Sequence, residues 1–174
     1  MKTIILCGGM GTRLREETEY KPKPMVEIGG KPILWHIMKH YSSYGYNDFI
    51  LALGYKGDVI RNYFLNYYNY NRDFTVDLSN GSLAIENKSS DNNWKVTLVE
   101  TGQESMTGFR AKIAGQFVNE ERFMLTYGDA VSTVNLKKLV EFNKKANTIG
   151  TVTGVYPPSR FGDLIVEKKY VKQF

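Results

Sequence analysis

The sequence predicts an α/β protein whose mixed, mostly parallel sheet has helices on both faces. Strand and helix patterns alternate along most of the chain, which is the order that builds parallel sheets. Hydrophobic residues make up 42% of the chain and charged residues 24%, as in ordinary globular proteins. No linker composition divides the 174 residues, so we expect a single domain over 1–174.

The first elements are a strand, a helix and a second strand. Thr3–Leu6 is a short apolar run that ends at glycines, as a buried strand does. Ile33–Tyr44 repeats apolar residues every three or four positions, which is typical of a helix, and Gly45 ends it. Asp48–Leu53 is again a short apolar run and is therefore predicted to be a buried strand.

A helix and three strands follow. Asp58–Tyr68 has helical spacing. Phe74–Leu78, Leu83–Glu86 and Trp94–Glu100 are rich in β-forming residues and are separated by polar turns. The Tyr- and Asn-rich run Asn66–Arg72 is predicted to be a helix end and loop, with an exposed aromatic subunit contact as the alternative.

The remaining elements continue the alternation and close with a hairpin. The patterns predict helices at Gly108–Phe117 and Leu136–Ala146, strands at Arg122–Tyr127 and Thr148–Tyr156, and a hairpin of Asp163–Glu167 with Tyr170–Phe174. The strand before Gly128 and the strand before Gly54 both end at glycine. Strand ends of this kind are the places where ligands bind in parallel sheets.

The net charge, the apolar runs and the cysteine content restrict the expected partners and compartment. The net charge is +5, but no cluster of five or more positive residues occurs, so we expect small polyphosphates and no nucleic acid. No apolar run reaches the length of a membrane span, and we expect no membrane contact. Cys7 is the single cysteine, which suits a reducing cytoplasm. His36 and His40 lie among apolar residues, which favours packing over metal binding.

Three polar features follow predicted strands and therefore meet at the same sheet edge. The loop Gly8-Gly9-Met10-Gly11-Thr12-Arg13 follows the first strand, Thr101-Gly102 follows the strand that ends at Glu100, and Gly128-Asp129 follows the strand that ends at Tyr127. The glycine loop matches neither the dinucleotide fingerprint nor the P-loop. Three glycines in four residues still let backbone N–H groups approach phosphate oxygens.

A lysine and an aspartate complete the predicted site. Lys23 lies between two prolines, which stiffen its segment, and a stiff cation suits stabilisation of developing charge. Lys21 competes for the same role, and the spacing alone does not separate the two. Asp129 at a strand end is placed to hold Mg²⁺ through oxygen, with capping of the following turn as the alternative. Together these parts predict nucleotidyl transfer without a protein nucleophile.

Several motifs resemble the sugar-phosphate nucleotidyltransferase family. They are Gly8-Gly9-Met10-Gly11-Thr12-Arg13-Leu14, Lys21-Pro22-Lys23-Pro24-Met25 and Gly30-Lys31-Pro32. Thr101-Gly102, Ser105 to Arg110, Tyr127-Gly128-Asp129 and the segment Pro157 to Gly162 are similar to its glucose-1-phosphate cytidylyltransferase branch. The resemblance implies a Rossmann-like fold and synthesis of CDP-glucose from CTP and α-D-glucose 1-phosphate, for surface polysaccharides. It also favours an oligomer.

The resemblance implies a role for each matching residue. Leu6, Cys7, Gly8, Gly9, Met10, Gly11 and Thr12 would hold the nucleotide and its phosphates. Arg13 and Lys23 would be catalytic and would also contact the nucleotide, so Lys23 is preferred to Lys21. Ser105, Arg110 and Gly128 would belong to the nucleotide site, and Asp129 would bind the magnesium ion.

Three departures from the family pattern qualify this expectation. Phe109 and Ala130 stand where the branch usually has glycine, and the bulk of Phe109 bears on the choice of base. Family members also continue further, so we expect this chain to lack a C-terminal part with a second metal-binding aspartate. The alternatives are therefore a nucleotide-binding paralogue with impaired catalysis, or a thymidylyl- or uridylyltransferase of the same family.

Overall fold

The computed structural model describes residues 1–9, 20–85, 93–146, 148–155, 165–167 and 170–173. These residues belong to two compact units, Met1–Thr133 and Val134–Phe174. The organisation of the whole chain as a single domain stays a prediction. Within the described ranges, no helix combines the length and the apolar character that crossing a bilayer requires.

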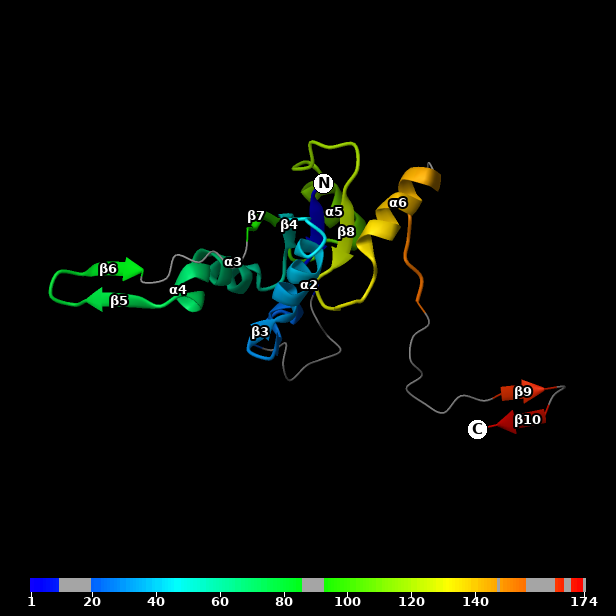
Figure 1. Cartoon of the computed structure of the whole chain (residues 1–174), viewed down its shortest axis with the longest axis horizontal. Coiled ribbons are helices and arrows are strands. Elements are labelled where there is room, and N and C mark those ends of the chain that lie inside the picture. Colours follow the sequence, from blue (N-terminus) through cyan, green and yellow to red (C-terminus); the bar gives the residue numbers. More distant parts are fainter. Residues whose placement is uncertain (10–19, 86–92, 147, 156–164, 168–169, 174) are drawn as a thin grey trace. The chain divides into compact units, whose positions relative to one another are not determined.

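A four-stranded parallel sheet forms the centre of the first unit (Figure 1). In spatial order its strands are β7 (Lys95–Glu100), β4 (Asp48–Leu53), β1 (Thr3–Leu6) and β8 (Met124–Tyr127). The central strand β1 pairs with β4 on one side and with β8 on the other. Since all four strands are parallel, their carboxyl ends meet at one edge, where the predicted site residues gather.

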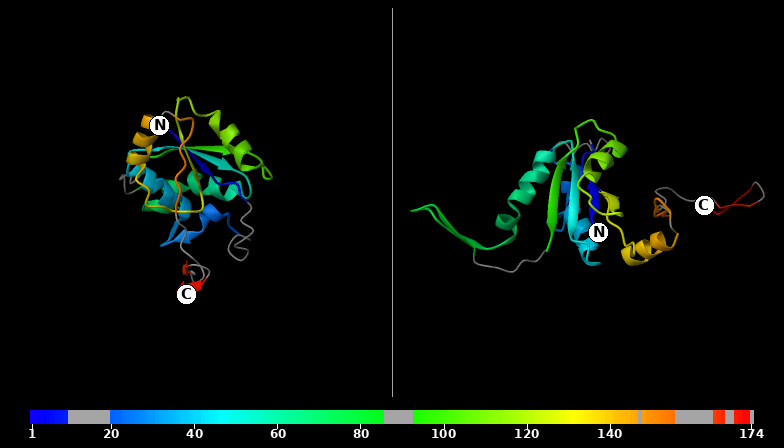
Figure 2. Two further views of the ribbon diagram at one scale, coloured as in Figure 1. Left: turned by 90° about the vertical axis from the view of Figure 1, so that its right-hand side faces the viewer. Right: turned by 90° about the horizontal axis from the view of Figure 1, so that it is seen from above.

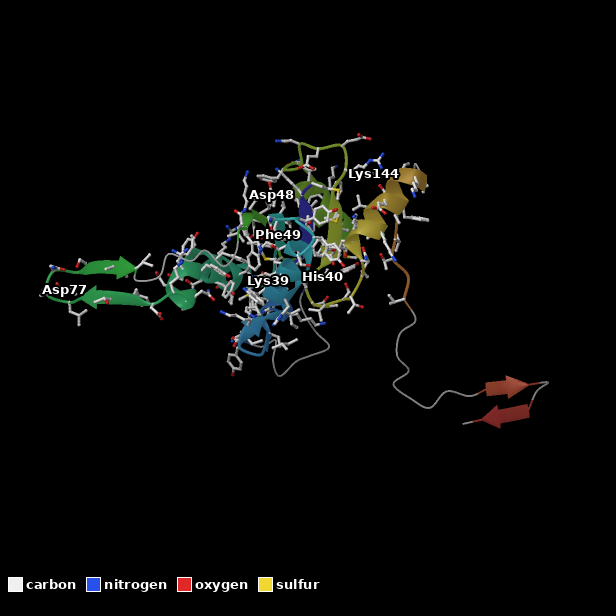
Figure 3. The ribbon with its side chains drawn as sticks, in the orientation of Figure 1. Lys39, His40, Asp48, Phe49, Asp77 and Lys144 are labelled. Atoms are coloured by element: carbon white, nitrogen blue, oxygen red, sulfur yellow. The ribbon has the colours of Figure 1, made fainter. Side chains whose placement is uncertain are left out.

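Helices cover both faces of this sheet, which confirms the predicted α/β class. Figure 2 shows α3 (Gly57–Leu65) and α5 (Thr107–Gly115) on opposite faces. Successive strand residues point to opposite faces. The cluster on one face is Ile4, Leu6, Ile50, Ala52 and Val99, packed with Ala114 of α5. The other face includes the fully buried Ile5, Phe49 and Leu51, of which Phe49 is labelled in Figure 3. Burial on both faces explains why these strands are continuous apolar runs.

Short elements connect the sheet to the remaining helices. The 3₁₀ helix η1 (Lys23–Met25) leads to the short antiparallel pair β2 (Glu27–Ile28) and β3 (Lys31–Pro32), and helix α2 (Ile33–Ser42) follows. The pair β2–β3 was not predicted. The turn between its strands is Gly29-Gly30, and both glycines have positive φ, which is the pattern of a tight hairpin turn. The two adjacent glycines were the sequence signal for this hairpin.

The predicted helix Asp58–Tyr68 consists of two helices, α3 and α4 (Tyr67–Asn71). The backbone leaves the helical conformation at Asn66, where φ is −100° and ψ is 14°. The Asn66 side-chain amide donates to the backbone oxygen of Asn62 at 3.0 Å and to its side-chain oxygen at 2.7 Å. Such local side-chain bonds compete with helix continuation. The chain then forms the antiparallel pair β5 (Phe74–Asp77) and β6 (Ser82–Ile85).

The second unit contains α6 (Leu136–Ala146) and the antiparallel pair β9 (Ile165–Glu167) and β10 (Tyr170–Gln173). Both the helix and the hairpin were predicted. The strand expected at Thr148–Tyr156 was wrong, because its described residues 148–155 form no strand. Ile149, Val152 and Val155 are at least three-quarters exposed, and a strand requires hydrogen bonds from a neighbouring strand. Position 156 lies outside the described residues.

Because the core lies on both faces of the sheet, we expect two apolar truncations to lower the free energy of unfolding by very different amounts. Ile50 is fully buried in the sheet, whereas Leu65 of α3 is 80% exposed. Ile50→Ala is expected to lower the free energy of unfolding by about 2–5 kcal/mol, and Leu65→Ala by less than about 0.5 kcal/mol. Urea unfolding followed by circular dichroism measures both. Equal losses in the two variants would contradict the assigned core.

Candidate functional site

A cavity of about 410 Å³ opens at the carboxyl edge of the sheet. It lies where β1 and β8 end, beside η1 and the loop that leads into α5. Its lining consists of Leu6, Cys7, Gly8, Gly9, Lys23, Pro24, Gln103, Glu104, Ser105, Met106, Thr107, Arg110, Tyr127 and Asp129. Segments far apart in the sequence therefore meet at one concave site, as expected for a ligand site in a parallel sheet.

The first two glycines of the loop after β1 have different roles. A Cβ added to the buried Gly8 would lie 2.2 Å from Nη1 of Arg110, whereas a Cβ on the exposed Gly9 would meet nothing within 4 Å. A Cβ on Gly54, at the end of β4, would lie 2.3 Å from the same nitrogen. Gly8 and Gly54 are therefore required because a guanidinium occupies the space beside them, and Gly9 alone keeps an open face toward the cavity.

Arg110 of α5 is 5% exposed and holds together two strand ends and a loop. Nη1 donates to the Leu53 backbone oxygen at 3.1 Å and to Thr101 Oγ1 at 2.7 Å. It also lies 2.7 Å from the Gly102 oxygen, and Nη2 donates to the Gln103 oxygen at 2.9 Å. The guanidinium thus fixes the loop that forms one wall of the cavity.

The positive charge of Arg110 contributes to the electrostatics of the cavity. Burial lowers the pKa of its guanidinium, and the charge of Glu100 opposes this shift. Arginine still remains protonated in proteins. The hydrogen-bond partners that the structure gives this side chain are all neutral oxygens. A buried positive charge beside Gly8 and the cavity favours an anionic ligand there.

Lys23 and Asp129 both line the cavity and form an ion pair there. Nζ of Lys23 lies 3.5 Å from Oδ2 of Asp129, and both side chains are partly exposed. Lys21 lies in a different environment, because its Nζ pairs with Oε1 of Glu27 at 2.7 Å and its side chain is half exposed. Lys23 therefore lines the cavity, whereas Lys21 is not among the lining residues. The catalytic role of Lys23 stays a prediction.

The backbone around Lys23 is fixed by prolines and by packing. The Met25 N–H donates to the Pro22 oxygen at 2.8 Å, which closes the 3₁₀ turn, and Pro24 is buried. A Cβ on Gly128 would lie 3.1 Å from Pro24 Cγ and 3.0 Å from the Leu6 oxygen. Gly128 is thus a packing glycine that lets β1, β8 and η1 approach one another. This close approach brings Lys23 next to Asp129.

Cys7 lines the cavity, but its thiol is buried and protonated. Its side chain is 1% exposed, and burial, followed by the charge of Asp129, raises the pKa of its thiol. A protonated thiol is a poor nucleophile. The cavity therefore offers the cations Lys23 and Arg110 and the carboxylates Glu104 and Asp129, but no activated cysteine for covalent chemistry.

Residues 2–174 match the family model described as nucleotidyl transferase. The chain belongs to the nucleotidyl transferase family. It is 49% identical to the glucose-1-phosphate cytidylyltransferase of Salmonella typhi, over 100% of this chain and 68% of that protein. It is 32% identical to a mannose-1-phosphate guanyltransferase of Aspergillus oryzae, over 95% of this chain and 41% of that protein.

A solved structure supports the same fold for this nucleotidyltransferase. HddC from Yersinia pseudotuberculosis superposes with a TM-score of 0.62 at 29% identity. The match covers 82% of this chain and 53% of the HddC chain. The Rossmann-like arrangement that the resemblance implied is therefore confirmed.

The cavity of this nucleotidyltransferase brings together most of the described site residues predicted from the sequence. Leu6, Cys7, Gly8, Gly9, Lys23, Ser105, Arg110 and Asp129 line it. Gly128 does not line the cavity and packs behind it. Met10, Gly11, Thr12 and Arg13 lie outside the described residues. The contact of each residue with a nucleotide stays a prediction.

The two departures from the family pattern have different surroundings. Phe109 is 53% exposed and is not part of the cavity lining, so its bulk does not narrow the cavity. Ala130 is exposed. Among the described non-glycine residues only Lys56 has a positive φ, so an alanine at position 130 fits without backbone strain.

The available donors fit a magnesium ion that also binds phosphate. Asp129 offers carboxylate oxygens and its side chain is 40% exposed, which leaves room for water and phosphate oxygens as further ligands. Among the described residues, no group of three or more His, Cys, Asp or Glu could hold a metal ion. His36 instead contacts the Ile28 oxygen, and the His40 ring packs on Tyr41.

Some lining residues were missed by the sequence reasoning. Gln103, Glu104 and Met106 come from the loop before α5, Thr107 is the first residue of α5, and Tyr127 is the last residue of β8. Their signal was their position, because each lies at or after the end of a strand or at the start of α5. Residue type alone did not distinguish them from ordinary loop residues.

The contact between Gly8 and Arg110 predicts unequal effects of two neighbouring substitutions. Gly8→Ala puts a methyl group against the guanidinium, and it is expected to lower the free energy of unfolding by about 1–3 kcal/mol. Gly9→Ala adds a methyl group in open space, and it is expected to change that free energy by less than about 0.5 kcal/mol. Urea unfolding of the two variants makes the comparison, and a larger loss for Gly9→Ala would show that the loop is arranged differently.

Proposed function

We propose that this chain carries the nucleotide site of a glucose-1-phosphate cytidylyltransferase, which forms CDP-glucose and pyrophosphate from CTP and α-D-glucose 1-phosphate. The observation that carries the proposal is the cavity at the sheet edge, where Lys23 and Asp129 lie 3.5 Å apart beside the loop after β1. The 49% identity to the Salmonella typhi cytidylyltransferase supports this choice of substrates.

The proposed reaction needs positioning and charge neutralisation. A phosphate oxygen of glucose 1-phosphate attacks the α-phosphorus of CTP in line, a new P–O bond forms, and the bond to the β-phosphate oxygen breaks to release pyrophosphate. Lys23 supplies positive charge at the cavity, and the short, proline-bounded helix η1 holds it there. A cation that needs little reorganisation stabilises charge most effectively as that charge develops.

We also propose magnesium as the cofactor, with Asp129 as its protein ligand. When bound by Asp129, the ion would supply positive charge that neutralises part of the phosphate charge. Asp129 contacts Lys23 through Oδ2, so the same carboxylate orients the lysine and offers oxygen to the ion. Arg13, which the family resemblance assigns to the triphosphate, would add a second cation.

The biological setting belongs to the same proposal. The single cysteine is a buried free thiol, which suits a reducing compartment such as the cytoplasm. CDP-glucose would then serve surface polysaccharide synthesis, as the family resemblance implies. We further propose that the protein is a homo-oligomer and that its partners are CTP and sugar 1-phosphate rather than nucleic acid or membrane.

A second candidate function is nucleotide binding without turnover. The chain spans 68% of the length of the Salmonella relative, and this observation motivates the candidate. A third candidate stays within the family and uses dTTP or UTP in place of CTP. Because Phe109 is not part of the cavity lining, its bulk gives no reason to prefer another base.

Pyrophosphate release from the 174-residue chain tests the three candidates together. CTP, UTP and dTTP are each mixed with glucose 1-phosphate and Mg²⁺, and each mixture is repeated with excess EDTA. The expected result is release with CTP that EDTA abolishes. Release only with dTTP or UTP supports the third candidate. CTP binding by calorimetry without pyrophosphate release supports the second candidate. The absence of both CTP binding and pyrophosphate release would refute the proposal.

Two lysine variants test the assigned catalytic cation. Lys23→Ala is expected to lower kcat by about 10²–10³-fold, the typical effect of removing one group that stabilises developing charge. Lys21→Ala removes a lysine that pairs with Glu27 at 2.7 Å, and it is expected to retain near-normal kcat. Circular dichroism checks that both variants fold. Comparable kcat losses in both variants would remove the basis for choosing Lys23.

A further inference from the structure

The turn that follows β7 is held by side chains that bond to its backbone. Ser105 Oγ donates to the Thr101 oxygen at 2.5 Å. Arg110 donates from Nη1 to the Gly102 oxygen at 2.7 Å and from Nη2 to the Gln103 oxygen at 2.9 Å. Three successive carbonyl groups of this turn are therefore fixed, and the backbone has a defined course beside the cavity.

Two polar side chains of this turn take no part in holding it. Gln103 and Glu104 are both exposed, and both line the cavity. Within the described part of the chain, neither side chain forms a hydrogen bond or an ion pair. A carboxamide and a carboxylate on a fixed backbone are therefore available to a ligand, and a few such groups give a ligand site its specificity.

Glu104 and Asp129 follow the two opposite edge strands of the sheet. β4 and β1 lie between β7 and β8 (Figure 1), and three spacings of about 4.8 Å put the edge strands on the order of 14 Å apart. Asp129 is paired with Lys23, whereas a carboxylate without such a partner repels phosphate. The phosphate groups of a nucleotide therefore belong at the β8 end of the cavity, and its nucleoside belongs at the end next to Glu104.

Met106 supplies an apolar surface at the same end of the cavity. Its side chain is 79% exposed and is part of the cavity lining. Thioethers pack favourably against aromatic rings, so Met106 is suited to contact the face of a base while Glu104 contacts the edge. Apolar contact with the face and hydrogen bonds to the edge are the usual means of binding a single base.

The hydrogen-bonding groups of the base edges separate the candidate nucleotides. Cytosine carries an amino group at position 4, which donates hydrogen bonds, whereas thymine and uracil carry the oxygen O4 there, which accepts them. An ionised carboxylate only accepts hydrogen bonds. A glutamate opposite this position therefore attracts cytosine and repels thymine and uracil.

We propose that Glu104 determines the choice of base by accepting a hydrogen bond from the 4-amino group of cytosine. The inference rests on the proposed function, because it takes CTP as the nucleotide, and it names the side chain that rejects UTP and dTTP. The carboxamide of Gln103 is available to donate to the neighbouring ring nitrogen N3, which is an acceptor in cytosine.

Two glutamate-to-glutamine substitutions test this role. Glu104→Gln preserves the size of the side chain but creates an amide that also donates, and that therefore accommodates O4 of uracil. Glu121→Gln changes the net charge equally, at a side chain that is 86% exposed and does not line the cavity. Calorimetry with Mg²⁺ present measures the Kd of CTP, UTP and dCTP, so the test does not depend on turnover. Circular dichroism checks that both variants fold.

The expected result is a loss of base preference in one variant. Wild type and Glu121→Gln are expected to bind CTP at least about tenfold more tightly than UTP, the typical discrimination by a well-placed hydrogen bond to a base edge. Glu104→Gln is expected to reduce this preference at least fivefold. The ratio of the Kd values for CTP and dCTP is expected to be the same in all three proteins.

Three results with bound nucleotide would overturn the inference. They are equal binding of CTP and UTP by the wild type, an unchanged preference in Glu104→Gln, and a change only in the preference for CTP over dCTP, which would assign Glu104 to the ribose. In each of these results, pyrophosphate release with CTP still decides the proposed function separately. A wild type that binds none of the three nucleotides would refute both.

Discussion

The site depends on one buried cation. Arg110 is almost fully buried, and burying a charge is unfavourable unless hydrogen bonds replace its hydration. Four neutral oxygens do so, from Leu53, Thr101, Gly102 and Gln103. These acceptors belong to the ends of β4 and β7 and to the loop before α5. The cost of burying the guanidinium therefore fixes the geometry of three separate segments, because any of them that moved away would leave a buried donor unpaired.

The same cation explains the glycines around it. There is no room for a Cβ at Gly8 or Gly54, because the guanidinium lies within about 2.3 Å of the position that each Cβ would take. Gly128 performs the corresponding function for the neighbouring strand pair by letting Pro24 approach Leu6 and Cys7. Close packing at the sheet edge thus brings Lys23 and Asp129 together, although they are far apart in the sequence.

The four-stranded sheet and the β5–β6 pair differ in how their apolar residues are covered. β1 and β4 are covered on both faces and therefore contain few polar residues. β5 and β6 alternate apolar and polar residues, and their apolar side chains Phe74, Val76, Leu83 and Ile85 are 41–51% exposed. A core forms where the chain supplies both layers, and apolar side chains stay partly exposed where the described part of the chain supplies only one.

The sequence by itself determined the fold class, the strands Thr3–Leu6 and Asp48–Leu53, and the helix Leu136–Ala146, because local periodicity and glycine stops act within a few residues. It also indicated that the loop after β1, Thr101-Gly102 and Gly128-Asp129 would meet, because parallel strands end at one edge. The motif resemblance already preferred Lys23 to Lys21, but only the tertiary structure showed that Lys23 pairs with Asp129 and Lys21 with Glu27. The tertiary structure also gave Arg110 its four oxygens, ended the helix at Asn66 and left residues 148–155 without a strand. These outcomes depend on partners distant in sequence or on competing hydrogen bonds, which no local pattern encodes.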